Sequence, residues 1–186
     1  MKPIMIDGGA CVGKITEEYT NTHTVFAFEP NSANFRALDY RYKCNNNVRL
    51  FKAALGNQSG KTSLLIPQHI ADHPCVSATI IPANNLTSNL ESQEDVQVIA
   101  LSQFCQEHGI DSIDVLKLDI EGAEYDVLED LFDSGLIHNI NKIFVEFHAR
   151  YCIPSMIERE QATINRLRLE YRGELYIYNW EKGCYE

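Results

Sequence analysis

Apolar segments and helical patterns alternate along the first third of the chain. Each apolar run is four to six residues long and rich in aromatic and β-branched residues, as buried strands are. The expected strands are residues 3–6, 24–29 and 48–53, and the expected helices are 14–19 and a longer one capped by Asn31. This β-α-β-α-β order predicts a parallel sheet that is covered by helices.

The same alternation continues after an irregular middle section. Residues 67–95 have little periodicity, and a loop of this length is usually a functional lid or a disordered segment. The further expected strands are 61–66, 96–101, 113–120 and 143–148, and the further helices are 102–108, 121–131 and one opened by a capping box at 155–158. Residues 174–180 indicate a closing hairpin or edge strands.

The first strand leads into a turn that is typical of nucleotide cofactor sites. Glycines at Gly8, Gly9 and Gly13 allow a tight turn and a close approach of a ligand to the main chain. Asp7 precedes them and would repel the pyrophosphate of NAD, whereas S-adenosylmethionine (SAM) carries a sulfonium and an ammonium. Asp7 therefore favours SAM, although Gly8-x-Ala10-x-x-Gly13 also matches the dinucleotide fingerprint and keeps an NAD-linked oxidoreductase as the alternative.

Carboxylates and one histidine follow the ends of four predicted strands. They are Asp7, Glu29, Asp119 and the pair Glu146 and His148. In an open parallel sheet, ligands bind at the carboxyl ends of the strands, so we expect these side chains to share one crevice. Glu29 is suited to accept hydrogen bonds from the two ribose hydroxyls of a nucleoside, which both SAM and NAD contain.

Composition limits the classes of function. With 45% hydrophobic and 23% charged residues, 186 residues predict one globular domain, and the early start of the cofactor turn indicates a domain cut from a longer protein. A formal net charge of -10 argues against nucleic acid and anionic membranes as partners. Six scattered cysteines without C-x-x-C spacing, no apolar span and no signal peptide predict reduced thiols and a cytoplasmic protein.

Several motifs together resemble the FkbM family of SAM-dependent methyltransferases. They are Ile6 to Gly13, Ala27 to Asn31 with Asn34-Phe35, Ala54-Leu55-Gly56, Leu116 to Glu124, and Val145 to His148. The resemblance implies a Rossmann-like class I methyltransferase fold, an α/β architecture with a mostly parallel seven-stranded sheet and an antiparallel closing strand. It also implies O-methylation of a hydroxyl, on a sugar or glycan or on a secondary metabolite such as a polyketide. Cys11 departs from the asparagine that is common in the family.

These observations assign a role to each candidate residue. The expected SAM contacts are Asp7, Gly8, Gly9, Ala10 and Gly13 at the methionine portion, Glu29 and Pro30 at the ribose, Ala54 and Leu55 at the adenine, and Asp119. The expected catalytic residues are His148, the best general base by its ordinary pKa, Asp119, the best by position, and Glu146. The same three residues are candidate ligands of a divalent metal, Mg²⁺ or Mn²⁺. A non-catalytic interaction domain is a further alternative.

Overall fold

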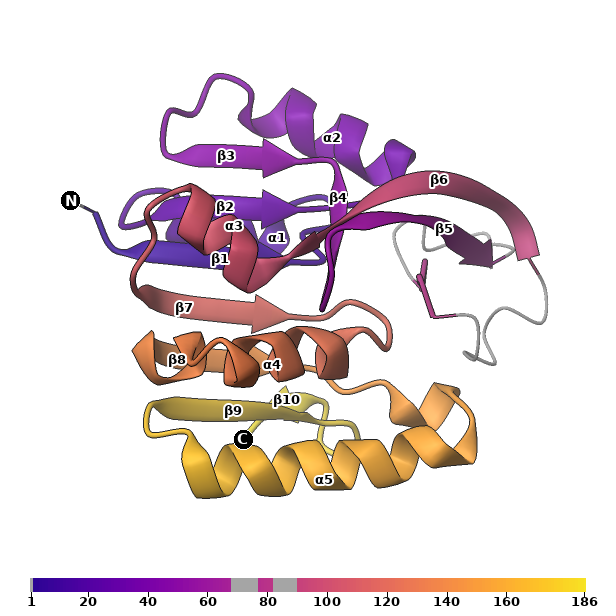
Figure 1. Ribbon diagram of the computed structural model, residues 1–186. Coiled ribbons are helices and arrows are strands. Elements are labelled where there is room, and N and C mark those ends of the chain that lie inside the picture. Colours follow the sequence, from indigo (N-terminus) through magenta and orange to yellow (C-terminus); the bar gives the residue numbers. More distant parts are fainter. Residues whose placement is uncertain (1, 68–76, 82–89) are drawn as a thin grey trace.

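A seven-stranded sheet forms the centre of the protein. The computed structural model describes residues 2–67, 77–81 and 90–186 (Figure 1). The sheet order is β10-β9-β8-β7-β1-β2-β3, and neighbouring strands are parallel except β10, which is antiparallel to β9. Its strands are β1 (Ile4–Gly8), β2 (Thr24–Phe28), β3 (Val48–Phe51), β7 (Ile113–Leu118), β8 (Ile140–Val145), β9 (Glu174–Asn179) and β10 (Cys184–Tyr185).

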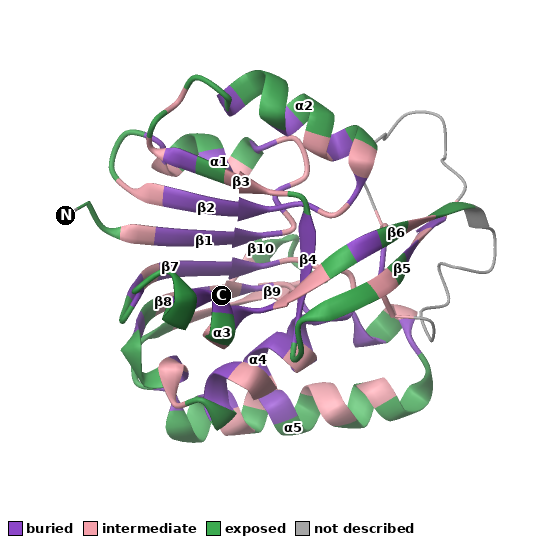
Figure 2. Cartoon of the chain, turned by 45° about the horizontal axis from the view of Figure 1, so that its top comes forward, coloured by how far each residue is buried: buried purple, intermediate pink, exposed green. Residues whose placement is uncertain are grey.

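Helices cover both faces of this sheet. They are α1 (Lys14–Tyr19), α2 (Ser32–Tyr42), α3 (Leu101–Glu107), α4 (Glu124–Asp133) and α5 (Pro154–Glu170), with 3-10 turns η2 (Leu136–Asn139) and η3 (Ala149–Tyr151). Side chains of α1 and α2 pack in one apolar cluster with Met5 and Val25, and those of α3, α4 and α5 pack in a larger cluster with Ile6 and Phe26. Because successive strand residues face opposite sides, each central strand contributes to both layers. Figure 2 shows that β1, β2 and β7 are buried along most of their length.

A smaller sheet lies against the carboxyl ends of the central strands. It contains β4 (Ala53–Gly56), β6 (Leu90–Ala100) and β5 (Gly60–Pro67), in that order, with β4 parallel and β5 antiparallel to β6. The chain leaves β3 at Lys52 and enters β4 directly, so the predicted single strand 48–53 is two strands in two sheets. Figure 1 shows β4, β5 and β6 beside the arrowheads of β1, β2 and β7.

The predicted fold class is confirmed, and the element boundaries need several corrections. The loop predicted at 67–95 is shorter than expected, because β5 reaches Pro67 and β6 begins at Leu90. Most of its remainder, and with it the lid interpretation, lies outside the described residues. The helix predicted from Glu121 begins at Glu124, since Glu121 and Gly122 have φ of 57° and 109°, which a helix does not accommodate.

Two features of the last helix also differ from expectation. The predicted capping box is absent: α5 begins at Pro154 after Ile153, and no side chain caps its first turn. The helical spacing of Ile157, Leu167 and Tyr171 predicts one core face, but only Leu167 and Tyr171 are buried there, and Ile157 is 56% exposed. Proline at the first helical position explains the start, because its fixed φ suits a helix and its missing N–H is not needed there. None of the helices in the described ranges is both long and apolar enough to cross a membrane.

Gly9 is the position where the fold depends most directly on glycine. Its φ is +76°, and a Cβ added there would lie 1.9 Å from the carbonyl oxygen of Asp119. We expect Gly9→Ala to lower the free energy of unfolding by about 2 kcal/mol or more, because both the backbone strain and the clash oppose the native turn. Gly60→Ala is the matched control, since no heavy atom lies within 4 Å of its added Cβ. Urea denaturation measures both variants, and equal stability would contradict this interpretation of the turn.

Candidate active site

The carboxyl ends of four parallel strands meet at one cavity of about 470 Å³. The loops after β1, β2, β7 and β8 supply one part of its wall, and β4 with residues of the small sheet supplies the other. Main-chain bonds keep these loops in register: Asp119 N donates to Gly8 O at 3.2 Å and Glu146 N donates to Leu118 O at 2.9 Å. The predicted crevice therefore exists at the predicted edge of the sheet.

The turn after β1 is joined to the end of β2 by the carboxylate of Glu29. Glu29 Oε2 accepts a hydrogen bond from Cys11 N at 2.8 Å, and Oε1 accepts one from Asn31 N at 2.8 Å. Burial raises the pKa of Glu29, and these two backbone donors act in the opposite direction. Cys11 itself has φ of 51°, a left-handed conformation that asparagine adopts more readily than cysteine.

Lys117 lies beneath the same turn and contacts two of its carbonyl groups and two carboxylates. Its ammonium donates hydrogen bonds to Gly8 O at 3.1 Å and Gly9 O at 2.8 Å. It also lies 3.5 Å from Asp7 Oδ1 and 3.4 Å from Asp119 Oδ2. Burial alone would lower the pKa of Lys117, but the charges of Asp7 and Asp119 outweigh it and raise the pKa above its ordinary value.

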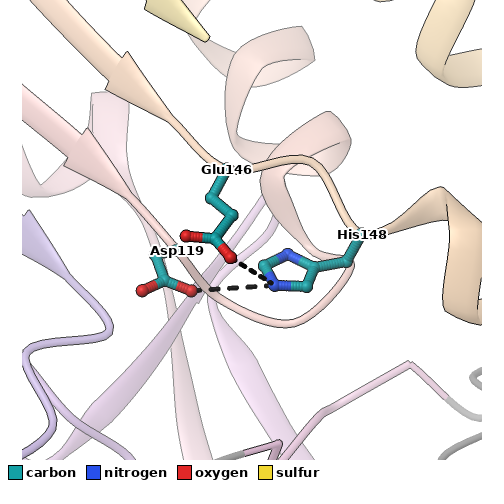
Figure 3. Close-up of side chains that lie close together, drawn as sticks. All are labelled: Asp119, Glu146 and His148. Carbon is teal, nitrogen blue, oxygen red and sulfur yellow. Dashed lines mark ion pairs between the residues drawn. The ribbon is translucent and has the colours of Figure 1, made fainter. Parts of the chain in front are cut away.

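His148 is surrounded by carboxylates at the other end of the cavity. Its Nε2 lies 3.7 Å from Asp119 Oδ1 and 3.8 Å from Glu146 Oε1, and both side chains point toward the ring in Figure 3. Its Nδ1 lies 2.9 Å from Oε1 of the fully buried Glu124. Burial lowers the pKa of His148, but Glu124, Glu121 and Asp119 raise it more, to about 10.

This electrostatic environment changes the role expected of His148. The neighbouring carboxylates raise the pKa of His148 to about 10, so the ring favours its protonated form at neutral pH and is poorly suited to act as a general base. Glu121 has a φ of 57°, lines the cavity next to His148, and burial with the neighbouring carboxylates raises its pKa to about 7. The His148 ring and the carboxylates of Asp119, Glu121, Glu124 and Glu146 form one charged cluster, the His148 cluster. This cluster strongly favours a positive charge at the ring.

Aromatic side chains complete the wall beside His148. The Trp180 ring meets the His148 ring edge to face with centroids 5.7 Å apart and the Tyr151 ring with centroids 5.6 Å apart. Trp180 Nε1 donates to Phe147 O at 3.0 Å, which fixes the indole, and the guanidinium of Arg150 lies 4.8 Å from the ring centroid. Trp180 and Tyr151 both line the cavity, and 36% of Trp180 remains exposed.

The structure brings most of the predicted site residues to this cavity. The wall includes Gly9, Glu29, Pro30, Ala54, Leu55, Asp119, Glu146 and His148. The other four candidates, Asp7, Gly8, Ala10 and Gly13, do not line it. Asp7 is fully buried below the turn, where its Oδ2 accepts a hydrogen bond from Thr16 Oγ1 at 2.6 Å. This geometry therefore does not support the expected direct contact between Asp7 and a cationic cofactor. Asp7 forms an ion pair with Lys117 instead.

Sequence reasoning missed Glu121, which lines the cavity, and Glu124, which lies outside the cavity and holds the His148 ring. The sequence places both residues in the predicted helix 121–131 and gives neither a role in the site. Glu146 and His148 were placed together on one strand, but β8 ends at Val145 and both residues lie in the following loop. The run of three acidic residues at 119, 121 and 124 was the available signal.

The fold and the cavity define a Rossmann-like methyltransferase architecture, and comparison with known families specifies it further. The model of the methyltransferase FkbM domain matches residues 7–167, so the chain belongs to the FkbM methyltransferase family. No curated protein and no solved structure gives a significant match to the chain. The family resemblance of the motifs is confirmed.

Removal of the Lys117 charge tests its role beneath the turn. We expect Lys117→Met to lower the free energy of unfolding by about 3–5 kcal/mol, because it leaves the buried Asp7 carboxylate without its partner. Combining it with Asp7→Asn should recover part of this loss, since the uncompensated charge is then gone. Lys61→Met, at an exposed position on β5, serves as the control in the same denaturation experiment. Equal stability of Lys117→Met and Lys61→Met would show that the pair is dispensable.

Proposed function

We propose that this protein is a SAM-dependent O-methyltransferase that methylates a hydroxyl group of a sugar or glycan. The observation that carries the proposal is the cavity at the strand ends, which combines a buried carboxylate for a ribose at one end with a charged cluster and an aromatic wall at the other. Membership of the FkbM methyltransferase family supplies the reaction class.

The residues present fit SAM better than NAD. Four of the residues that line the described part of the cavity are carboxylates, Glu29, Asp119, Glu121 and Glu146, and none is lysine or arginine. Such a wall suits the two positive charges of SAM and repels the pyrophosphate of a dinucleotide. Gly9 and Glu29 would hold the methionine and ribose portions, and Ala54 with Leu55 would face the adenine. The volume of about 470 Å³ is in the range of small-molecule sites.

Methyl transfer requires that an acceptor hydroxyl loses its proton. When bound, SAM supplies an electrophilic methyl group on a sulfonium. The acceptor oxygen gives up its proton as the O–C bond forms, and the C–S bond breaks with its electron pair going to sulfur. Asp119, Glu121 and Glu146 line the cavity beside His148, and their carboxylates can accept the proton of a hydroxyl at this end.

A sugar acceptor is supported by the aromatic wall. Trp180 is held by its hydrogen bond to Phe147 O and presents a partly exposed ring to the cavity next to the His148 cluster. An indole held in this way offers a flat apolar face for the C–H side of a sugar ring, while the carboxylates of the cluster are available for its hydroxyls. Hydroxyls on a polyketide or another secondary metabolite are the competing acceptor class.

Calorimetric titration with S-adenosylhomocysteine and with NAD⁺ tests the cofactor. We expect S-adenosylhomocysteine to bind and NAD⁺ not to bind. Glu29→Gln should weaken S-adenosylhomocysteine binding roughly 10- to 100-fold, because it removes a charged acceptor from the ribose end. The matched control is Glu18→Gln on the exposed surface of α1, which should bind as the unaltered protein does. NAD⁺ binding without S-adenosylhomocysteine binding would refute the proposal.

A methyl-transfer screen tests the acceptor class. We expect methylation of a hydroxyl among sugars, glycans and nucleotide sugars, detected by mass spectrometry, and no transfer to polyketide alcohols. With the acceptor in hand, Trp180→Ala should raise its KM about 3- to 10-fold through the lost ring contact, and leave the KM for SAM unchanged. Trp180→Phe should recover part of the loss, and Tyr40→Ala, at an exposed ring on α2, is the control. Transfer to polyketide alcohols alone would reassign the acceptor.

A further inference from the structure

Three carboxylate oxygens surround His148 Nε2 at distances longer than a hydrogen bond. Nε2 lies 3.6 Å from Glu121 Oε2, 3.7 Å from Asp119 Oδ1 and 3.8 Å from Glu146 Oε1. Each of these separations is longer than a hydrogen bond between charged groups, which is about 2.7–2.9 Å. The hydrogen bond given for this ring within the described part of the chain is the one from Nδ1 to Glu124, and the side chain of His148 is only 3% exposed.

Glu124 fixes which nitrogen of His148 faces the carboxylates. Glu124 is fully buried and accepts hydrogen bonds from Ile120 N at 2.9 Å and Gly122 N at 3.1 Å, in addition to its contact with His148 Nδ1 at 2.9 Å. An ionised carboxylate only accepts hydrogen bonds, so Nδ1 carries a proton and Nε2 points toward the cavity. Metal-binding histidines are commonly held by a carboxylate in this way.

The spacing of the oxygens around Nε2 matches a bound ion better than a proton. A proton on Nε2 would draw one carboxylate to hydrogen-bond distance, whereas the carboxylate oxygens found around it among the described residues lie 3.6–3.8 Å away. One donor atom from each of Asp119, Glu146 and His148 can be chosen so that all lie within 4.8 Å of one another. Metal-ligand bonds of about 2.0–2.3 Å place ligands at such separations. Figure 3 shows the carboxylates of Asp119 and Glu146 both directed toward the same ring nitrogen of His148.

We propose that Asp119, Glu146 and His148 bind a divalent cation of the Mn²⁺ type, with Glu124 as the residue that positions the His148 ring. One imidazole and two carboxylates form a mixed donor set, which favours Mn²⁺ over Mg²⁺ because Mg²⁺ prefers oxygen donors alone. The Asp119 side chain is 35% exposed and that of Glu146 is 17% exposed, so the cavity gives an ion access to the site. Three ligands leave positions open for water or an acceptor oxygen.

The purpose of such an ion rests on the proposed methyltransferase function. A hydroxyl that coordinates the ion has a lowered pKa, so it loses its proton to a carboxylate or to water more readily before the O–C bond forms. The ion also takes the place of the positive charge that the cluster favours at His148 Nε2.

Titration of the purified protein with Mn²⁺, followed by the electron paramagnetic resonance signal of free Mn²⁺, tests the site. We expect one Mn²⁺ per chain. Glu146→Gln and His148→Gln should each lower the affinity at least tenfold, because each removes one ligand. Glu158→Gln, an exposed carboxylate on α5, is the matched control and should bind as the unaltered protein does. No bound Mn²⁺ at millimolar concentration, or equal affinity in the site variants, would overturn the proposal.

Glu124→Gln tests the positioning role separately. It should weaken Mn²⁺ binding about 10- to 100-fold while calorimetry shows unchanged affinity for S-adenosylhomocysteine, since Glu124 does not line the cavity. Unchanged Mn²⁺ affinity would overturn this role. The two titrations also separate the two proposals. If S-adenosylhomocysteine binds but Mn²⁺ does not, the metal site is refuted and the proposed cofactor stands. A Mn²⁺ site that the variants abolish, without S-adenosylhomocysteine binding, supports the metal and refutes the cofactor.

Discussion

The buried ammonium of Lys117 is the interaction on which the cofactor turn depends. It contacts the strand before the turn, the turn itself and the end of the neighbouring strand, through the carbonyls of Gly8 and Gly9 and the carboxylates of Asp7 and Asp119. In the described part of the protein Asp7 Oδ1 receives no hydrogen bond, so the charge of Lys117 at 3.5 Å is its compensation. A buried charge without a partner would cost several kcal/mol, which ties the shape of the turn to this pair.

Local patterns in the sequence predicted the sheet and its polar edge well. Alternating apolar runs depend on burial of whole strands, and the strands β1, β2 and β7 are buried along nearly their entire length. The approach failed where a backbone conformation overrides residue preference. Glu121 has a positive φ that no propensity would suggest, and this delays α4 by three residues and turns Glu121 toward the cavity.

The partners of each charge were harder to predict than the positions of the charges. The sequence shows Asp7 at a strand end, but only the packed sheet shows that Lys117, 110 residues later, lies under it and neutralises it. The role of Glu124 likewise appears only when the loop after β8 returns His148 to the start of α4. Both cases depend on contacts between segments far apart in sequence, which periodicity and spacing do not encode.

Asp119 connects the two charge networks of the cavity. Its Oδ2 lies 3.4 Å from the ammonium of Lys117 beneath the turn, and its Oδ1 lies 3.7 Å from Nε2 of His148 at the opposite end. The rigid strand β7 places this carboxylate at the boundary, and the bond from its amide to Gly8 O keeps it there. A change in charge at His148 therefore acts on the turn through Asp119, because both networks share this carboxylate. The position of Asp119 gives the protein a physical link between the end proposed for the cofactor and the end proposed for the metal and the acceptor.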